Sequence, residues 1–223
     1  MKKNIAHIVT LTSLSIAVLS IIQSCNLNFL ISSYLILISL ILDGIDGAIA
    51  RYLKTESNFG KQLDSLSDMV AFGLAPAILL YNFIGHEINP NISYITILIP
   101  IFSALRLANY NNNYSTTTFQ GITTPVSALL LISIPLINKF EDNAYVLDLL
   151  MNKYIIIGLI LITSILLISP FKTFSLRIDA IRHDKRKLFY IFISICVLYL
   201  FNITGLLLII LIYILLSVTK LIT

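Results

Sequence analysis

Four aspartates lie close together in a chain that is otherwise mostly apolar. The protein has eleven acidic residues, and the stretch from residue 43 to residue 68 contains five of them, of which four are aspartates: Asp43, Asp46, Asp64 and Asp68. Residues three or four positions apart share one face of a helix, so two helices packed side by side would direct these carboxylates to one place. Carboxylates gathered in this way repel one another unless cations lie between them, and hard oxygen ligands favour Mg²⁺, Mn²⁺ or Ca²⁺ over zinc. The stretch therefore predicts a site for divalent cations.

The same stretch contains residues suited to a phosphorylated ligand. Gly47 and Gly60 leave space in which a bulky ligand can approach the backbone. The forked guanidinium of Arg51 matches the geometry of phosphate oxygens. Ser57 or Asn58 can cap the helix that carries the second aspartate pair.

Further polar residues lie at the ends of other apolar segments. Arg106 is either an interface anchor or a ligand for a phosphate or carboxylate, and its position alone favours neither. Asn109 begins a polar run after it, and residues 119–125 form a glycine- and proline-containing turn that we expect beside the entrance of the site. In the first apolar segment, His7 and Thr10 are read as packing groups in preference to substrate contacts.

The composition is that of a membrane protein. The chain has 223 residues, of which 57% are hydrophobic and only 12% are charged, and its mean hydropathy is +0.93. We expect an all-α fold, a polytopic membrane helical bundle of about eight transmembrane helices. The last two apolar segments are shorter than the roughly 20 residues that span a bilayer and could form one re-entrant hairpin. The predicted apolar segments are residues 5–23, 29–51, 66–84, 92–107, 122–137, 154–169, 188–201 and 206–218.

The chain is expected to form a single integral membrane domain. Its core comprises about residues 1–170, followed by an amphipathic basic segment at 171–187 that contacts anionic lipid, and by a C-terminal helical hairpin at 188–219. Within the third apolar segment, Gly73 and Pro76 predict a kink. The loop at 138–153 shows no structural signal.

The basic residues predict the orientation. With the N-terminus placed in the cytoplasm, thirteen of the fifteen lysines and arginines fall on the cytoplasmic side, and only Lys139 and Lys153 fall outside. This positive-inside bias also directs the aspartates towards the cytoplasm. The net charge of +4 is therefore attributed to membrane orientation, and no nucleic-acid partner is expected.

Two other interpretations of these patterns remain open at this point. Aspartates within membrane segments could line the ion path of a cation transporter, although acids confined to two adjacent helices disfavour it. The first segment, which ends near Cys25, also has features of a signal peptide with a lipoprotein cleavage site, which we disfavour because Gln23 fits that site poorly.

The aspartate stretch resembles the signature of the CDP-alcohol phosphotransferase family. The signature D-x-x-D-G-x-x-A-R-x8-G-x3-D-x3-D is matched at every fixed position. The matching residues are Asp43, Asp46, Gly47, Ala50, Arg51, Gly60, Asp64 and Asp68.

This resemblance implies a set of roles for the residues. The four aspartates would hold two divalent cations, either Mg²⁺ or Mn²⁺ with Ca²⁺ as the alternative, and Asp68 would also act as the general base. CDP-diacylglycerol would be bound by Gly47, Ala50, Arg51 and Gly60, with its acyl chains in a groove open to the bilayer. Arg106 and Asn109 would bind the acceptor alcohol. The resemblance further implies that the protein forms a homodimer and contacts membrane lipids. It would lie in a bacterial cytoplasmic membrane, with its site facing the cytoplasm.

Three other stretches resemble the members of the family that use L-serine as the acceptor and release phosphatidylserine and CMP. They are DSLSDMVAFGLAPA at 64–77, SALRLANYN at 103–111 and FQGITTP at 119–125. Two positions depart from that pattern: Asn109 replaces an arginine, and Thr123-Thr124 replaces the commoner Leu-Pro. The same chemistry with glycerol 3-phosphate, inositol phosphate or choline as the acceptor is the alternative.

Overall fold

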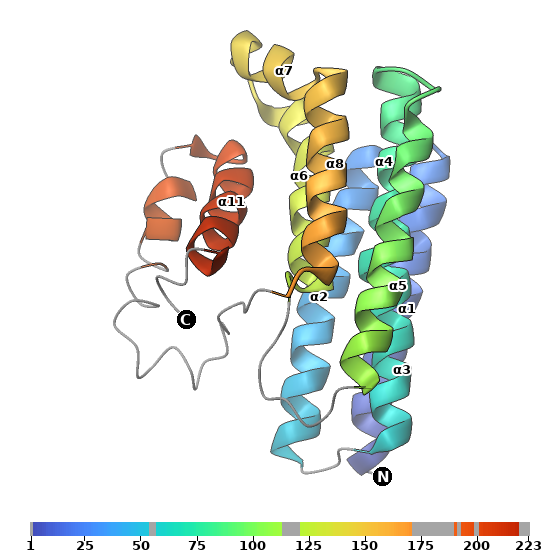
Figure 1. The fold of residues 1–223 in the computed structure, drawn as a ribbon. Helices are drawn as coiled ribbons and strands as arrows, with labels where there is room; N and C mark the ends of the chain where they lie inside the picture. Colours follow the sequence, from blue (N-terminus) through green and yellow to red (C-terminus); the bar gives the residue numbers. More distant parts are fainter. Residues whose placement is uncertain are drawn as a thin grey trace.

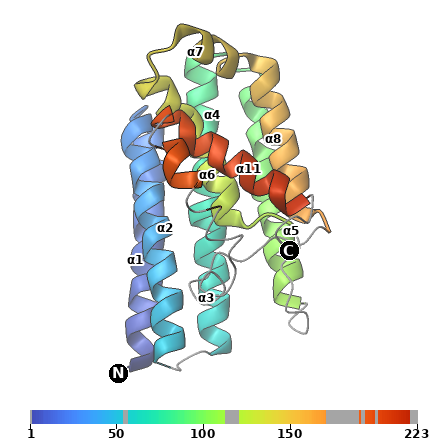
Figure 2. The same ribbon diagram turned by 90° about the vertical axis from the view of Figure 1, so that its left-hand side faces the viewer.

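The described part of the protein is a bundle of helices. The computed structural model describes residues 2–53, 57–112, 121–170, 190, 193–198 and 201–218, and these residues contain no strand. The basic segment at 171–187 lies outside them. Figures 1 and 2 show that the long helices run along a common axis, with α7 at one end of the bundle and the N-terminus at the other. The all-α prediction is confirmed.

The first two helices form an antiparallel pair. α1 (Lys2–Cys25) and α2 (Phe29–Tyr52) are joined by a short turn. Between them, the hydroxyls of Ser13 and Ser39 lie 2.8 Å apart and those of Ser20 and Ser32 lie 2.9 Å apart. Small hydroxyl side chains allow close approach of helices in an apolar environment and bond across the interface, so they hold α2 firmly against α1.

The third long helix is continuous but not uniform. It consists of α3 (Asn58–Asp68), a π-helical turn η1 (Met69–Leu74) and α4 (Ala75–Glu87). The Ser57 hydroxyl accepts a hydrogen bond from the Gly60 amide at 3.1 Å, which confirms the predicted cap. Pro76 has no amide hydrogen to donate to the residue four positions earlier. The helix widens in this region without breaking.

The remaining described helices complete the bundle. They are η2 (Ser93–Ile97), α5 (Leu98–Asn112), α6 (Thr124–Phe140), α7 (Ala144–Leu150), α8 (Lys153–Ile168) and α11 (Thr204–Val218). The loop at 138–153 was wrongly read as featureless, since it contains α7. The missed signal was Asn143, whose side chain accepts hydrogen bonds from the amides of Tyr145 and Val146 and so caps this helix.

The main apolar core lies between α4, α6 and α8, and α11 packs onto α6. Its fully buried members include Leu80, Phe83, Leu131, Ile156 and Ile160.

Helix length supports fewer membrane crossings than the eight predicted. Three described helices are long and apolar enough to span a bilayer, at residues 6–25, 29–49 and 58–87, and the pair α7 and α8, bent by 58°, could form a fourth. α6 and α11 are apolar but shorter. These apolar helices are those of an integral membrane protein, and the count of eight remains a prediction.

Candidate active site

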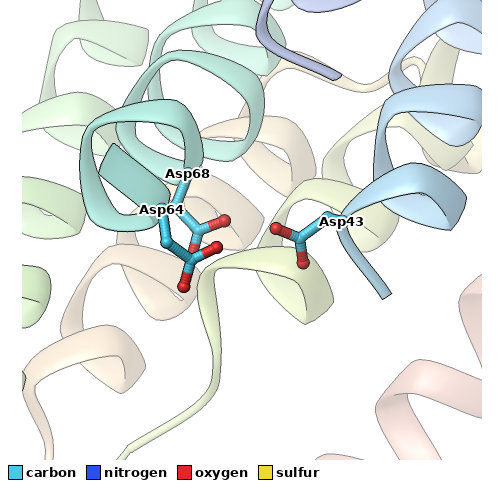
Figure 3. A group of neighbouring side chains, drawn as sticks. All are labelled: Asp43, Asp64 and Asp68. Carbon is cyan, nitrogen blue, oxygen red and sulfur yellow. The ribbon is translucent and has the colours of Figure 1, made fainter. Parts of the chain in front are cut away.

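Three of the four aspartates meet between α2 and α3. One carboxylate oxygen from each of Asp43, Asp64 and Asp68 lies within 4.8 Å of the others. Figure 3 shows Asp64 and Asp68 on adjacent turns of one helix, with Asp43 opposite them on another helix. The predicted convergence of carboxylates from two helices is therefore present for these three residues.

Asp46 stands beside this group but is not part of it. Its side chain is only 3% exposed, and its carboxylate lies near the hydroxyl of Thr10 on α1. Three residues of α-helix correspond to about 300° of rotation, so Asp46 is turned by roughly 60° from Asp43. That rotation directs Asp46 towards α1.

The carboxylates suit a divalent cation. Oδ2 of Asp46 and Oδ1 of Asp68 are buried and accept no hydrogen bond from any described residue. A buried carboxylate oxygen without a partner is costly, and several carboxylates side by side are more so. A hard cation removes both costs, and oxygen atoms are the ligands that Mg²⁺, Mn²⁺ and Ca²⁺ prefer. The aspartate group can therefore bind a metal ion.

Gly60 allows α3 to approach α1 closely. A Cβ atom at Gly60 would lie 3.0 Å from Cε1 of His7 and 3.2 Å from Oγ of Ser57. The His7 ring also packs edge-on against Phe59, with 5.4 Å between ring centroids. Gly60 lies one helical turn before Asp64. Part of the space that Gly60 was expected to leave for a ligand is therefore filled by the side chain of His7.

Gly47 and Arg51 lie together at the end of α2. A Cβ atom at Gly47 would meet Nη1 of Arg51 at 3.4 Å, so the guanidinium folds back over the glycine. The Arg51 side chain is exposed. The side chain of Ala50, which was assigned to the same ligand, lies outside the described structure.

A polar cavity of about 300 Å³ opens beside the aspartates. It is bounded by α1, the end of α2, α3 and the end of α5, and it brings cationic and anionic side chains to one space. Its charged and hydrogen-bonding members are His7, Thr10, Asp46, Arg51, Ser57, Lys61, Asp64, Ser65, Tyr110 and Asn111. We call this space the polar cavity.

Arg106 is buried in the bundle. Its side chain is 9% exposed, and its Nη1 atom donates a hydrogen bond to the Thr124 hydroxyl at 3.3 Å. The guanidinium lies close enough to Asp68 for the opposite charges to interact, while its Nε has no partner among the described residues. The alternative of an exposed interface anchor is therefore wrong, and Arg106 belongs to the surroundings of the aspartates.

Asn109 and Asn111 have different environments. Asn109 is exposed and does not line the polar cavity. Asn111 lines it, and its amide nitrogen donates to the Ser65 hydroxyl at 3.1 Å, which links α5 to α3. The helix therefore turns Asn111, and not the assigned Asn109, towards the site.

The turn before α6 leads to Thr124, which lies beside Arg106. Gly121 has a φ of +70°, and a Cβ atom there would lie 2.6 Å from the carbonyl oxygen of Leu167, so the position requires glycine. None of the described residues 121–125 lines the polar cavity, so the expected place of this turn beside the entrance of the site stays a prediction. Residues 119 and 120 lie outside the described range.

Comparison with known proteins identifies the family. A model of the CDP-alcohol phosphatidyltransferase family matches residues 3–219. The chain belongs to this family.

Curated relatives narrow the comparison. The chain is 32% identical over 166 residues to a CDP-diacylglycerol–serine O-phosphatidyltransferase of Helicobacter pylori, covering 71% of this chain and 69% of the relative. It is 37% identical over 164 residues to a protein of the same name from Methanocaldococcus jannaschii, covering 73% and 75%. An archaetidylserine synthase of Methanothermobacter thermautotrophicus is 33% identical over 135 residues, covering 56% and 54%.

Three residues that line the polar cavity were not assigned to the site from the sequence. His7 and Thr10 were read as packing groups in preference to substrate contacts; both line the polar cavity, and His7 also packs against Phe59 as that interpretation expects. Lys61 was counted only as a charge that orients the protein, although it lines the same space. The available signal was position: Lys61 follows Gly60 directly, and His7 and Thr10 are three residues apart on one helix face.

Proposed function

We propose that this protein transfers the phosphatidyl group of CDP-diacylglycerol to L-serine, giving phosphatidylserine and CMP. The observation that carries the proposal is the meeting of Asp43, Asp64 and Asp68 within 4.8 Å at the edge of a polar cavity. The names of the Helicobacter and Methanocaldococcus relatives support both substrates. The stretches at 64–77 and 103–111 support serine as the acceptor.

The aspartates would hold the metal. Asp43, Asp46, Asp64 and Asp68 offer the oxygen ligands for two divalent cations, for which we propose Mg²⁺ or Mn²⁺. When bound, such ions neutralise charge on the diphosphate and on the departing CMP. Arg51 and Lys61 bring positive charge to the same cavity and would bind the phosphate oxygens of the donor.

The proton of the acceptor requires a base. The serine hydroxyl oxygen forms a bond to the phosphorus that carries the diacylglycerol, the bond from that phosphorus to CMP breaks, and the hydroxyl proton passes to Asp68. The Oδ1 atom of Asp68, which is buried and has no hydrogen-bond partner among the described residues, would receive this proton. Arg106, beside Asp68, would hold the serine carboxylate through its Nε atom, which has no partner within the described part of the chain.

The setting of the reaction is also proposed. One integral membrane domain would carry the site on the cytoplasmic side of a bacterial cytoplasmic membrane, and two copies would form a homodimer. The positive-inside bias supports the orientation.

The test is release of CMP from membranes that contain the protein. CDP-diacylglycerol with Mg²⁺ or Mn²⁺ should give CMP only when serine is added, and chelation of the metal should abolish the release. Glycerol 3-phosphate, inositol phosphate and choline serve as matched acceptors. Release with one of these and none with serine would assign another acceptor, and no release with any of them would contradict phosphatidyl transfer.

A further inference from the structure

Three buried polar atoms lie where α3 and η1 meet α5, and none of them is hydrogen-bonded to any described residue. They are Oδ1 of Asp68, Nε of Arg106 and Oγ of Ser103. The first two already have roles in the proposed function, whereas Ser103 has none. Its side chain is fully buried, with an exposed fraction of 0%. A buried hydroxyl without a partner is costly, so a bound molecule that pairs with it would remove that cost.

Ser103 lies against the π-helical turn that follows Asp68. A Cβ atom at Gly73 would lie 3.1 Å from Cβ of Ser103 and 3.4 Å from its Oγ. The same Cβ atom would lie 3.2 Å from Sδ of Met69, the residue directly after Asp68. The absence of a side chain at Gly73 therefore leaves room for the Ser103 hydroxyl next to the helix end that carries Asp68. Short π-helical segments are frequent at functional sites.

Arg106 approaches the same region from α5. Ser103 and Arg106 are three positions apart and so share one face of the helix. Long side chains on a helix point back towards its N-terminus, which brings the guanidinium of Arg106 towards Ser103. The hydrogen bond to Thr124 and the nearby charge of Asp68 hold the guanidinium there. The three unpartnered atoms therefore surround one small region between α3 and α5.

These three atoms differ in what they can bind. Nε of Arg106 only donates a hydrogen bond, the carboxylate oxygen of Asp68 only accepts one, and the hydroxyl of Ser103 can do either. L-Serine carries three polar groups: a carboxylate, a hydroxyl and an ammonium group. The proposed function pairs the carboxylate with Arg106 and the hydroxyl with Asp68. It leaves the ammonium group, which has only hydrogens to donate, without an acceptor.

We propose that the Ser103 hydroxyl accepts a hydrogen bond from the ammonium group of the acceptor and thereby makes the site selective for an amino acid. This rests on the proposed function, in which serine is the acceptor. Glycerol 3-phosphate and inositol phosphate have no amino group, and the quaternary nitrogen of choline has no hydrogen to donate. The contact with Ser103 therefore favours serine over all three of these alternatives.

The test compares L-serine with two analogues that each lack one group. 3-Hydroxypropanoate lacks the amino group, and ethanolamine lacks the carboxylate. In the CMP-release assay, Ser103→Ala should raise the KM for serine by about 10–100-fold, as expected for a lost hydrogen bond to a charged group, with kcat little changed. Inhibition by ethanolamine should weaken to a similar extent, whereas inhibition by 3-hydroxypropanoate should not change. Arg106→Ala should show the reverse pattern for the two analogues.

Ser217→Ala is the matched control. Ser217 is equally buried, and its Oγ also has no partner within the described part of the chain, but it lies on α11, which packs onto α6. This variant should leave the KM for serine and both inhibition constants unchanged. Equal effects of Ser103→Ala and Ser217→Ala would overturn the proposal. Equal weakening of serine and of both analogues in Ser103→Ala would assign Ser103 to helix packing and would also overturn it.

Thermal unfolding in detergent separates this contact from the proposed function. Serine should raise the unfolding midpoint of the unaltered protein but not that of Ser103→Ala, while 3-hydroxypropanoate should act equally on both. That pattern in a protein that releases no CMP with serine would uphold the ammonium contact while removing the proposed function. Release of CMP with an unchanged KM for serine in Ser103→Ala would uphold the function and overturn the contact. No stabilisation by serine and no release of CMP would overturn both.

Discussion

At the scale of single residues, Asp68 is the aspartate of the site that lies beside both the other carboxylates and the guanidinium of Arg106. It ends α3, directly before the π-helical turn, it meets Asp43 and Asp64, and it lies beside Arg106. Its Oδ1 has no partner among the described residues. These contacts suit a group that takes a proton next to bound cations.

We predict that Asp68→Asn stops turnover while donor binding persists. The amide keeps the shape of the side chain but cannot accept a proton, so the rate of CMP release should fall by about 10²–10⁴-fold. Binding of CDP-diacylglycerol, measured by displacement of a fluorescent analogue, should change little. Asp148→Asn on α7 is the control, because Asp148 is exposed and remote from the site. A near-normal rate in Asp68→Asn would remove the base assignment.

Arg106 gives a second prediction at this scale. Arg106→Ala should raise the KM for serine far more than the KM for CDP-diacylglycerol, because the guanidinium is assigned to the serine carboxylate. Steady-state kinetics with each substrate varied in turn measures both constants. Thr124→Val is the control. It removes the 3.3 Å hydrogen bond to Arg106 but keeps the charge of the Arg106 guanidinium, so it should raise the KM for serine much less. Equal increases in both constants in Arg106→Ala would contradict the carboxylate role.

At the scale of helices, the sequence spacing predicted which aspartates come close together. The packing of the helices decided which neighbouring helix each aspartate faces. Asp64 and Asp68 are four residues apart and lie on one face of α3. Asp43 and Asp46 are only three residues apart, so Asp43 faces α3 whereas Asp46 is turned towards α1. Around Gly73 and Pro76, where a kink was predicted, the helix contains a π-helical turn. Sequence propensities do not distinguish these outcomes, because the turn is packed against α5: a Cβ atom at Gly73 would lie 3.1 Å from Cβ of Ser103.

The contact between α1 and α3 provides a prediction about helix packing. Gly60→Ala places a methyl group 3.0 Å from the His7 ring, which should push α3 away from α1 and lower activity. Because the clash is with the end of a side chain, His7→Ala should restore part of the activity in the double variant Gly60→Ala/His7→Ala. The readouts are CMP release and thermal unfolding in detergent.

The control for this pair is Gly158→Ala on α8. A Cβ atom at Gly158 would have no neighbour within 4 Å, so this variant should behave like the unaltered protein. Absence of rescue in the double variant would mean that Gly60 is needed mainly for the bound ligand, as the sequence first suggested, and not for helix packing.

At the scale of the whole molecule, the sequence indicated a helical membrane bundle and the pair of helices that carries the site. Composition and the signature sufficed to predict the bundle and this pair of helices, because both features depend only on residue type and on local periodicity. They did not reveal that Asn111, and not Asn109, lines the polar cavity, since two residues rotate a helix by about 200°. Nor did they reveal the short helix α7.

The orientation of the bundle gives the last prediction. The end of α2 and the α7 region lie at opposite ends of the molecule (Figure 1), and each has an exposed tyrosine: Tyr52 at 87% and Tyr145 at 77%. After Cys25 and Cys196 are replaced by serine, a membrane-impermeant maleimide added to intact cells should label Tyr145→Cys and leave Tyr52→Cys unlabelled until the cells are opened. This result follows from the excess of lysine and arginine on the side of Tyr52. The reverse pattern would place the aspartates outside the cytoplasm, away from the nucleotide-linked donor that the proposed function requires.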